Sequence, residues 1–163
     1  MKVIVLDIDG VLVNRDWYIA GGERAKAAPE CVRALNRIID ATGASIVVST
    51  SRRRNKSFAE VVDMIYSYGV IGEVVGMTPV LDVQNIRVYG AVSRETEIRA
   101  WLDSHGWPEA FVILDDDNDV GFPDRHVRTK FDAGLTEADA DRAIEILGRC
   151  SVYSAVLHNA EAF

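Results

Sequence analysis

The sequence contains few thiols and no long apolar run. Its only cysteines, Cys31 and Cys150, are far apart and form no CxxC pair. We therefore expect reduced, packed thiols, and neither a disulfide framework nor a zinc site. No stretch approaches the roughly 18 apolar residues of a membrane span. Asp7 and Asp9 interrupt the apolar start, and no small-residue cleavage site follows, so we predict a cytoplasmic protein with no membrane partner.

Positive charge is also scarce. There are 18 Lys and Arg residues against 25 Asp and Glu residues, a formal net charge of −7. This balance disfavours an extended nucleic-acid-binding face, although a local basic patch remains compatible with it. Internal repeats, low-complexity stretches and interdomain linkers are absent. The 163 residues are enough for one domain with a full core, and we expect a single domain over residues 1–163.

Short apolar runs alternate with helix-forming segments. The runs predicted to be strands are Val3–Leu6, Ile46–Val48, Val74–Val75, Phe111–Leu114 and His126–Arg128. Helices are predicted to begin near Pro29, Ser57, Ser93 and Thr136, each at a capping residue or a proline. This alternation predicts an α/β fold: a three-layer, Rossmann-like, mainly parallel sheet with helices on both faces.

The polar residues 14–28 form an insertion after the first strand, too small for a domain and suited to a flap or small cap. It contains Trp17 and Tyr18. These rings either stack on a base or pack the flap onto the domain. Both readings remain open from the sequence.

Three polar clusters follow predicted strands: Asp7 with Asp9, the run 49–52, and the acidic run 115–119. In parallel α/β sheets, ligands bind outside the carboxyl ends of the strands, so these clusters are expected to share one edge. An ionised aspartate is a competent nucleophile at phosphorus, and Asp7 is the candidate. Asp9 is then suited to protonate the leaving oxygen and later to deprotonate water.

A phosphate approaches several carboxylates only if a cation offsets the repulsion. Mg²⁺ prefers oxygen ligands, and the absence of Cys and His from the clusters argues against zinc. Asp7 and Asp115 are the candidate carboxylate ligands, supported by Asp116 or Asp119. Thr50, the amides that follow it and a Lys or Arg from elsewhere are expected to bind the phosphoryl oxygens.

Together these clusters resemble the motifs of the haloacid dehalogenase (HAD) superfamily of phosphatases. The first motif, an apolar run and then DxDG[VT], matches Val3–Val11. The second, an apolar strand ending in Ser or Thr, matches Ile46–Thr50, with Thr50 as the preferred hydroxyl and Ser49 as the alternative. The resemblance implies the HAD-type fold with at most a small cap, an aspartyl-phosphate intermediate and Mg²⁺ as cofactor.

The third and fourth motifs are weaker. The third is a Lys or Arg near a helix start, which we place at Arg94, with Arg87 and Lys130 as substitutes. The fourth matches Asp115-Asp116, and Asp115 with Asp119 also fits. By resemblance, the metal ligands are Asp7, the backbone carbonyl of Asp9, Asp115, and Asp116 or Asp119.

The spacing is also similar to the HAD domain of multi-domain RNA-repair proteins. Shared features include RxxEIxxWL from Arg94 and the segment Gly76–Pro79, while Thr50-Ser51-Arg52 resembles the phosphatase domain of phage polynucleotide kinase-phosphatase. The implied activity is removal of a terminal phosphate, a 3′-phosphate, from a nucleotide or polynucleotide. Thr50, Ser51 and Arg52 are then the phosphate-binding residues.

Other functions remain open. A phosphatase of small metabolites has the same motifs, so the expected partner is a phosphorylated small molecule or a nucleic-acid end. A phospho-receiver module places its phosphorylated Asp on a later strand, so the DxDG pattern after the first strand disfavours it. A catalytically inactive binding module would not need every acid of the motifs, and all of them are present. The basic run Arg52–Arg54 with Lys56 either contacts substrate or is a solvated loop. His105, His126 and His158 have no ligand spacing.

Overall fold

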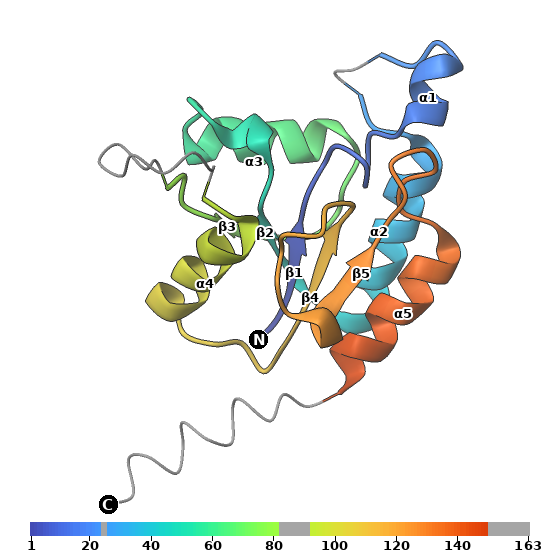
Figure 1. Ribbon diagram of the computed structural model, residues 1–163. Coiled ribbons are helices and arrows are strands. Elements are labelled where there is room, and N and C mark those ends of the chain that lie inside the picture. The colour runs from blue at the N-terminus through green and yellow to red at the C-terminus, as the bar shows by residue number, and fades with distance from the viewer. Residues whose placement is uncertain (24–25, 82–91, 150–163) are drawn as a thin grey trace, which may run out of the picture.

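Five strands form the centre of the molecule, in a computed structural model that describes residues 1–23, 26–81 and 92–149. Their bounds are β1 (Lys2–Leu6), β2 (Ser45–Val48), β3 (Val74–Met77), β4 (Ala110–Asp115) and β5 (His126–Arg128). They lie in the order β3-β2-β1-β4-β5, and every pairing is parallel (Figure 1). The predicted strands and the predicted parallel sheet are confirmed.

Helices α2 to α5 begin where Pro29 and the predicted capping residues place them. Their bounds are α1 (Arg15–Ile19), α2 (Pro29–Thr42), α3 (Phe58–Ser67), α4 (Arg94–His105) and α5 (Glu137–Gly148), with 3₁₀ turns at Ser51–Arg53 and Pro123–Arg125. Pro29 is the first residue of α2. Reciprocal capping boxes open α3, with Ser57 and Glu60, and α5, with Thr136 and Asp139. These boxes satisfy backbone amides that have no partner within the first turn.

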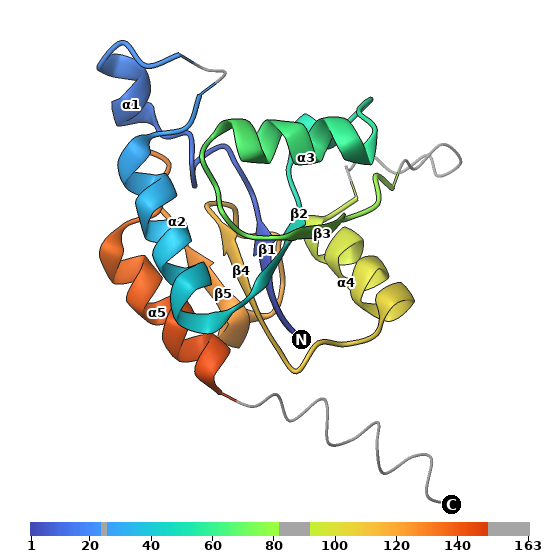
Figure 2. The ribbon, with the colours of Figure 1, turned by 180° about the vertical axis from the view of Figure 1, so that it is seen from behind.

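Side chains of the sheet alternate between two cores. Ile4 and Leu6 of β1 face α2, α3 and α5, whereas Val3 and Val5 face α4. Figures 1 and 2, seen from opposite sides, show α2 beside α5 on one face and α4 on the other. Strands β1 and β4 are therefore buried on both faces, which explains why they are continuous apolar runs. The predicted three-layer arrangement is confirmed.

The insertion 14–28 contains a short helix, α1, that the sequence pattern does not predict. The side-chain oxygen of Asn14 caps it by accepting a hydrogen bond from the Trp17 amide at 2.7 Å. The Asn14 side-chain amide donates to the Ala133 carbonyl, also at 2.7 Å, which ties α1 to the loop between β5 and α5. Trp17 packs against the core, whereas Tyr18 is exposed. The two rings therefore have different environments.

Some sequence predictions lie outside the described residues, namely those for Arg87, Cys150, His158 and the tail 151–163. Cys31 is a buried free cysteine, as predicted. Among the described residues, no helix is both long enough and apolar enough to cross a membrane. The single domain over residues 1–163 stays a prediction.

Candidate active site

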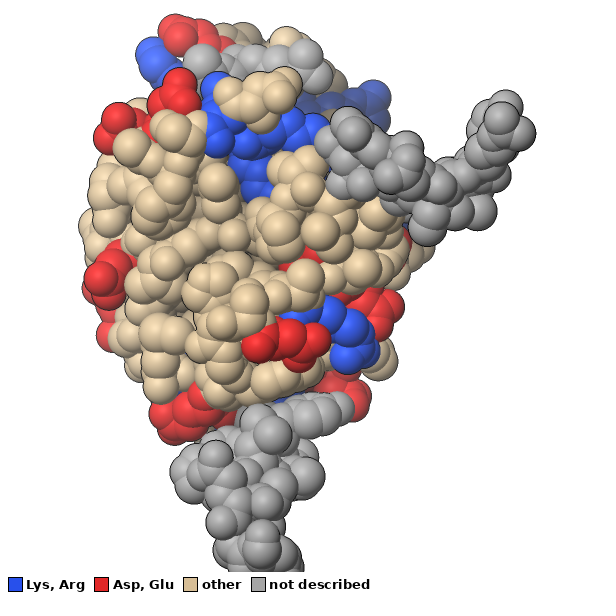
Figure 3. Space-filling model, turned by 90° about the vertical axis from the view of Figure 1, so that its left-hand side faces the viewer, with Lys and Arg blue, Asp and Glu red and all other residues tan. Residues whose placement is uncertain are grey.

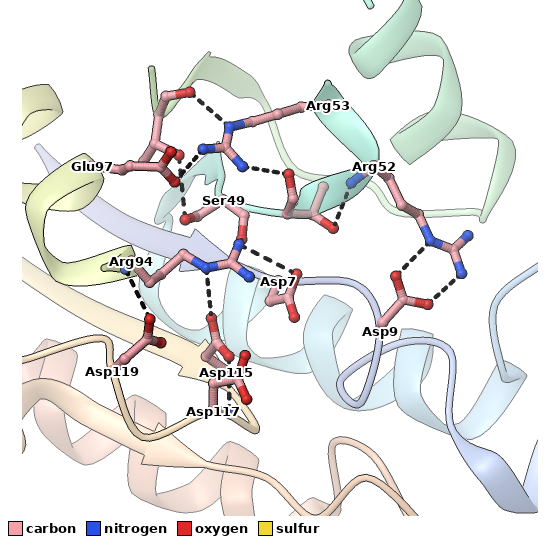
Figure 4. A network of polar contacts seen from close by, with 12 residues as sticks. Asp7, Asp9, Ser49, Arg52, Arg53, Arg94, Glu97, Asp115, Asp117 and Asp119 are labelled. Atoms are coloured by element: carbon pink, nitrogen blue, oxygen red, sulfur yellow. Dashed lines mark hydrogen bonds and ion pairs between the residues drawn. The ribbon is translucent and has the colours of Figure 1, made fainter. Parts of the chain in front are cut away.

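The carboxyl ends of three adjacent strands bring the predicted site residues together. Leu6 of β1 lies opposite Val48 of β2 and Leu114 of β4, so the chain leaves all three strands at the same level. The residues that follow are Asp7, Ser49 and Asp115. Figure 4 shows Asp7, Ser49 and Asp115 around the guanidinium of Arg94. The second and fourth motifs are far apart in the sequence. They lie on either side of the first motif because β2 and β4 flank β1 in the sheet.

Three acids form a compact cluster. One carboxylate oxygen each from Asp7, Asp115 and Asp116 lies within 4.8 Å of the other two. Asp116 reaches this cluster across Gly10, where an added Cβ would lie 2.3 Å from the Asp116 Cγ. Gly10 also has a φ of +79°, a conformation that glycine adopts at little cost. The glycine of DxDG therefore serves both the turn and the approach of the third acid.

Burial makes this cluster electrostatically costly. It raises the pKa of Asp7 from 3.8 to about 6 and that of Asp115 to about 7, the latter with help from the Asp7 charge. Oδ2 of Asp115 is buried and has no hydrogen-bond partner among the described residues. Buried carboxylates are stable as anions only beside compensating charge. An all-oxygen set with an unsatisfied buried atom fits a hard divalent cation such as Mg²⁺.

Arg94 supplies positive charge at the start of α4. Its guanidinium lies 3.8 Å from carboxylate oxygens of both Asp7 and Asp115, and it donates a hydrogen bond to the Ser49 carbonyl. Its backbone amide donates to the Asp119 carboxylate at 3.1 Å. Arg94 therefore lies within the site, where the resemblance places it. Asp119, the alternative metal ligand, holds the start of α4 and lies outside the three-acid cluster.

The two candidate hydroxyls of the second motif point in different directions. The Thr50 hydroxyl is hydrogen-bonded to the Asp7 carboxylate, which lowers the pKa of Asp7 against the larger effect of burial. The Ser49 hydroxyl accepts a hydrogen bond from Thr78 at 3.3 Å, on the side of β3. Both residues are buried. Thr50 is thus the hydroxyl that faces the candidate nucleophile.

Arg52 forms a bidentate ion pair with Asp9. Its Nε and Nη2 donate to the two carboxylate oxygens at 2.8 and 2.5 Å, and Nη1 donates to the Tyr68 hydroxyl at 3.2 Å. The Asp9 carboxylate raises the pKa of Arg52 by accepting these bonds. Figure 4 shows this pair apart from the group around Asp7 and Arg94. Asp9, the candidate proton-transfer residue, is therefore held by a cation from the second motif.

A buried ion pair that the sequence pattern does not predict lies behind the site. Arg53 binds Glu97 of α4, with Nη2 2.5 Å from Oε2, and both side chains are buried. The other carboxylate oxygen of Glu97 accepts from the Leu81 amide at 3.1 Å. The Arg53 guanidinium also donates to three backbone carbonyls, those of Thr50, Thr78 and Pro79. This pair joins the loops after β2 and β3 to the helix that carries Arg94.

Arg53 lies in a run of three arginines. Such a run is typical of a solvated loop, so the sequence pattern does not mark Arg53 as buried. Glu97 offers a better signal, because it lies four residues before the buried Trp101 and next to the buried Ile98. An acid on the apolar face of a helix needs a partner. That requirement predicts a buried cation, although the sequence does not say which arginine supplies it.

Replacing Arg53 with methionine is expected to lower the free energy of unfolding by about 3–5 kcal/mol, because the Glu97 charge would remain buried without its partner. Chemical denaturation measures this loss. Arg54→Met is the matched control, since Arg54 is exposed, and it should change stability by less than about 0.5 kcal/mol. Equal effects of the two variants would contradict a structural role for the pair. The double variant Arg53→Met with Glu97→Leu should recover much of the loss.

One family model matches nearly the whole described chain. A model described as the HAD domain in Swiss Army Knife RNA repair proteins matches residues 3–140. The matched range begins in β1 and ends within α5, so it contains all the site residues described above. No curated protein matches the chain.

Proposed function

Because this chain belongs to the family of HAD domains found in Swiss Army Knife RNA repair proteins, we propose that it is a Mg²⁺-dependent phosphatase acting on the 3′-phosphate end of a nucleotide or polynucleotide. The observation that carries the proposal is the meeting of Asp7 with Thr50, Arg94 and two further acids at one sheet edge. Family membership gives the class of chemistry, and the intact set of side chains supports catalysis rather than binding alone.

Asp7 acts as the nucleophile. Its carboxylate oxygen attacks phosphorus while the bond from phosphorus to the leaving oxygen breaks, giving an aspartyl phosphate on Asp7. Arg94, 3.8 Å away, favours the ionised carboxylate despite burial. The Thr50 hydroxyl and the Ser51 amide are the proposed donors to phosphoryl oxygens, and the Arg52 amide supports the Thr50 hydroxyl by donating to its oxygen at 3.4 Å. These donors begin a 3₁₀ turn whose first carbonyl, that of Thr50, is held by Arg53.

Asp9 transfers the protons. In its acid form it gives a proton to the leaving oxygen, and as a carboxylate it then takes one from the water that attacks the aspartyl phosphate. The bond from Asp7 to phosphorus breaks, inorganic phosphate leaves and both residues return to their starting forms. Arg52 holds Asp9 through two hydrogen bonds, so Asp9 has to exchange this partner before it can protonate a leaving group. A substrate phosphate offers Arg52 an equally good bidentate acceptor.

Mg²⁺ is the cofactor that the acid cluster fits best. Asp7, Asp115 and Asp116 would hold it, together with the backbone carbonyl of Asp9 by family resemblance. When bound, the ion neutralises carboxylates and phosphoryl oxygens so that the two can approach. The unsatisfied oxygen of Asp115 supports this assignment independently of the family.

The basic residues after β2 support a nucleic-acid end as the substrate. Arg54 and Lys56 are exposed, and Lys56 borders a hollow together with Arg52 and Tyr68. Figure 3 shows Lys and Arg side chains gathered on one part of a largely uncharged face. The net charge of −7 favours the competing reading, a small-metabolite phosphatase, because it provides no long track for a polyanion.

A substrate screen separates these two readings. We expect kcat/KM for a 3′-phosphorylated oligonucleotide to exceed that for sugar phosphates by about tenfold or more, because contacts outside the phosphate add to recognition. Phosphate release should be measured with Mg²⁺ for 3′- and 5′-phosphorylated oligonucleotides of one sequence, for mononucleotides and for sugar phosphates. Sugar phosphates turning over best would reverse the assignment of substrate while leaving the chemistry intact.

A further inference from the structure

A small hollow opens beside Asp9. It has a volume of about 120 Å³ and mostly apolar walls. The residues that line it are Asp9, Val13, Asn14, Arg15, Tyr18 and Phe131. Pockets that enclose whole drug-sized ligands have roughly 300–1,000 Å³, so this one suits a single flat ring system. Asp9 is the proposed proton donor to the leaving group. A leaving group that takes its proton from Asp9 would therefore lie next to this hollow.

Two exposed aromatic rings border this hollow. Tyr18 of α1 is 50% exposed, and Phe131, in the loop between β5 and α5, is 53% exposed. Single exposed aromatic residues are common on protein surfaces. Here, however, two rings from segments far apart in the sequence share one hollow with an acid of the site. Aromatic walls of this kind bind flat, π-rich ligands through stacking.

The two walls are held together by the backbone. The amides of Arg15 and Asp16 donate to the carbonyls of Phe131 and Asp132, each at 3.1 Å. An ion pair between Arg15 and Asp132, 3.2 Å long, adds to this contact. The walls are joined to the nucleophile loop as well, because the Gly10 amide donates to the Val13 carbonyl at 2.8 Å. The backbone segments that carry the two rings are therefore joined before any ligand enters.

Phe131 also borders a second, larger hollow of about 580 Å³. That hollow is lined by three acids, the cluster acid Asp116 with Asp117 and Asp132, and by two exposed cations, Arg128 and Lys130. The Phe131 ring thus stands between two hollows that both reach carboxylates of the site. Arg128 and Lys130 add cations beside this ring, and cations next to a stacking ring are a combination that proteins use for single-stranded nucleic acid.

We propose that the hollow between Tyr18 and Phe131 is a subsite for the base of the terminal nucleoside, the group that leaves when its 3′-phosphate is removed. This inference rests on the proposed function, and it names the part of the substrate that the domain recognises beyond phosphate. Of the aromatic pair in the insertion, Tyr18 contacts the base, whereas Trp17 anchors α1 to the core. Stacking requires no particular base, so the subsite accepts all four.

Binding should be measured in a protein that cannot turn substrate over. In an Asp7→Asn background, a fluorescently labelled, 3′-phosphorylated oligonucleotide is titrated, and an otherwise identical strand with an abasic terminal residue serves as its partner. Tyr18→Ala and Phe131→Ala should each weaken binding of the first strand by about tenfold and leave binding of the abasic strand unchanged. Tyr18→Phe should bind as the parent does, because it keeps the ring. Tyr66→Ala, which removes an exposed ring from α3, is the control.

The outcomes separate the subsite from the activity. If the alanine variants weaken both strands equally, or neither, the base subsite is wrong. If they weaken only the strand with a terminal base, the subsite stands, even if the wild-type protein releases no phosphate. Absence of phosphate release by the wild type from oligonucleotides and from glycerol phosphate would overturn the proposed phosphatase function alone.

Discussion

Asp7→Asn is expected to abolish Mg²⁺-dependent release of phosphate, with kcat reduced on the order of 10⁴-fold or more, because an amide oxygen is a poor nucleophile at phosphorus. The variant should fold, since the amide keeps the size of the carboxylate and removes a charge whose burial is unfavourable. Release of phosphate from an aryl phosphate measures activity, and circular dichroism checks the fold.

Asp40→Asn is the matched control for that substitution. Asp40 is an exposed aspartate near the end of α2, so the same chemical change should leave activity within about twofold. A covalent phosphoryl group on the wild-type protein, trapped by rapid denaturation and absent from Asp7→Asn, would identify the residue that is modified. Full activity in Asp7→Asn would contradict its role as nucleophile.

Asp115→Asn is expected to remove activity while making the metal-free protein more stable at high pH. The pKa values of Asp7, about 6, and Asp115, about 7, both exceed the ordinary value of 3.8. The folded state therefore binds these protons more tightly than the unfolded chain does. The stability that the protonated groups contribute is complete below pH 4 and is lost as the pH rises through about 6 and 7. In the variant, the amide cannot ionise.

Thermal unfolding at pH 5 and pH 8, in EDTA and in Mg²⁺, tests this expectation. In EDTA, the wild-type melting temperature should fall between pH 5 and pH 8, and Asp115→Asn should melt roughly 5 °C above the wild type at pH 8. Mg²⁺ should raise the wild-type melting temperature at pH 8 and leave that of the variant nearly unchanged. Asp124→Asn, at an exposed position, should behave as the wild type. If the melting temperature of the wild type changed with neither pH nor Mg²⁺, the proposed metal site would be contradicted.

The parts of the site that the sequence predicts are those fixed by local signals and by strand order. Asp7 and Asp115 each follow an apolar run, and the carboxyl ends of parallel strands share an edge, so their meeting follows from the fold class. Arg94 is similarly marked by Ser93, which caps its helix. In such cases a few neighbouring residues determine both the element and the direction in which the chain leaves it.

The remaining features depend on packing between distant segments. Arg53 and Arg54 are identical neighbours in the sequence, yet one is buried against Glu97 and the other is exposed. Likewise, nothing local distinguishes Tyr18, which borders a hollow, from Trp17, which packs on the core. A 3₁₀ turn and a short capped helix set these orientations. Sequence patterns of period two or 3.6 carry no information about such turns.

The position of β1 in the sheet has a consequence for the newly synthesised protein. β1 is made before both of its neighbours, β2 and β4, and β4 is made only after β3 and α4. Until β4 leaves the ribosome, Asp7 lacks Asp115, and Arg94 has one fewer carboxylate to bind. The Asp7 carboxylate is then an ordinary solvated group, because the burial that raises its pKa in the folded protein is missing. A nascent chain therefore carries the proposed nucleophile without its full site until β4 has been made.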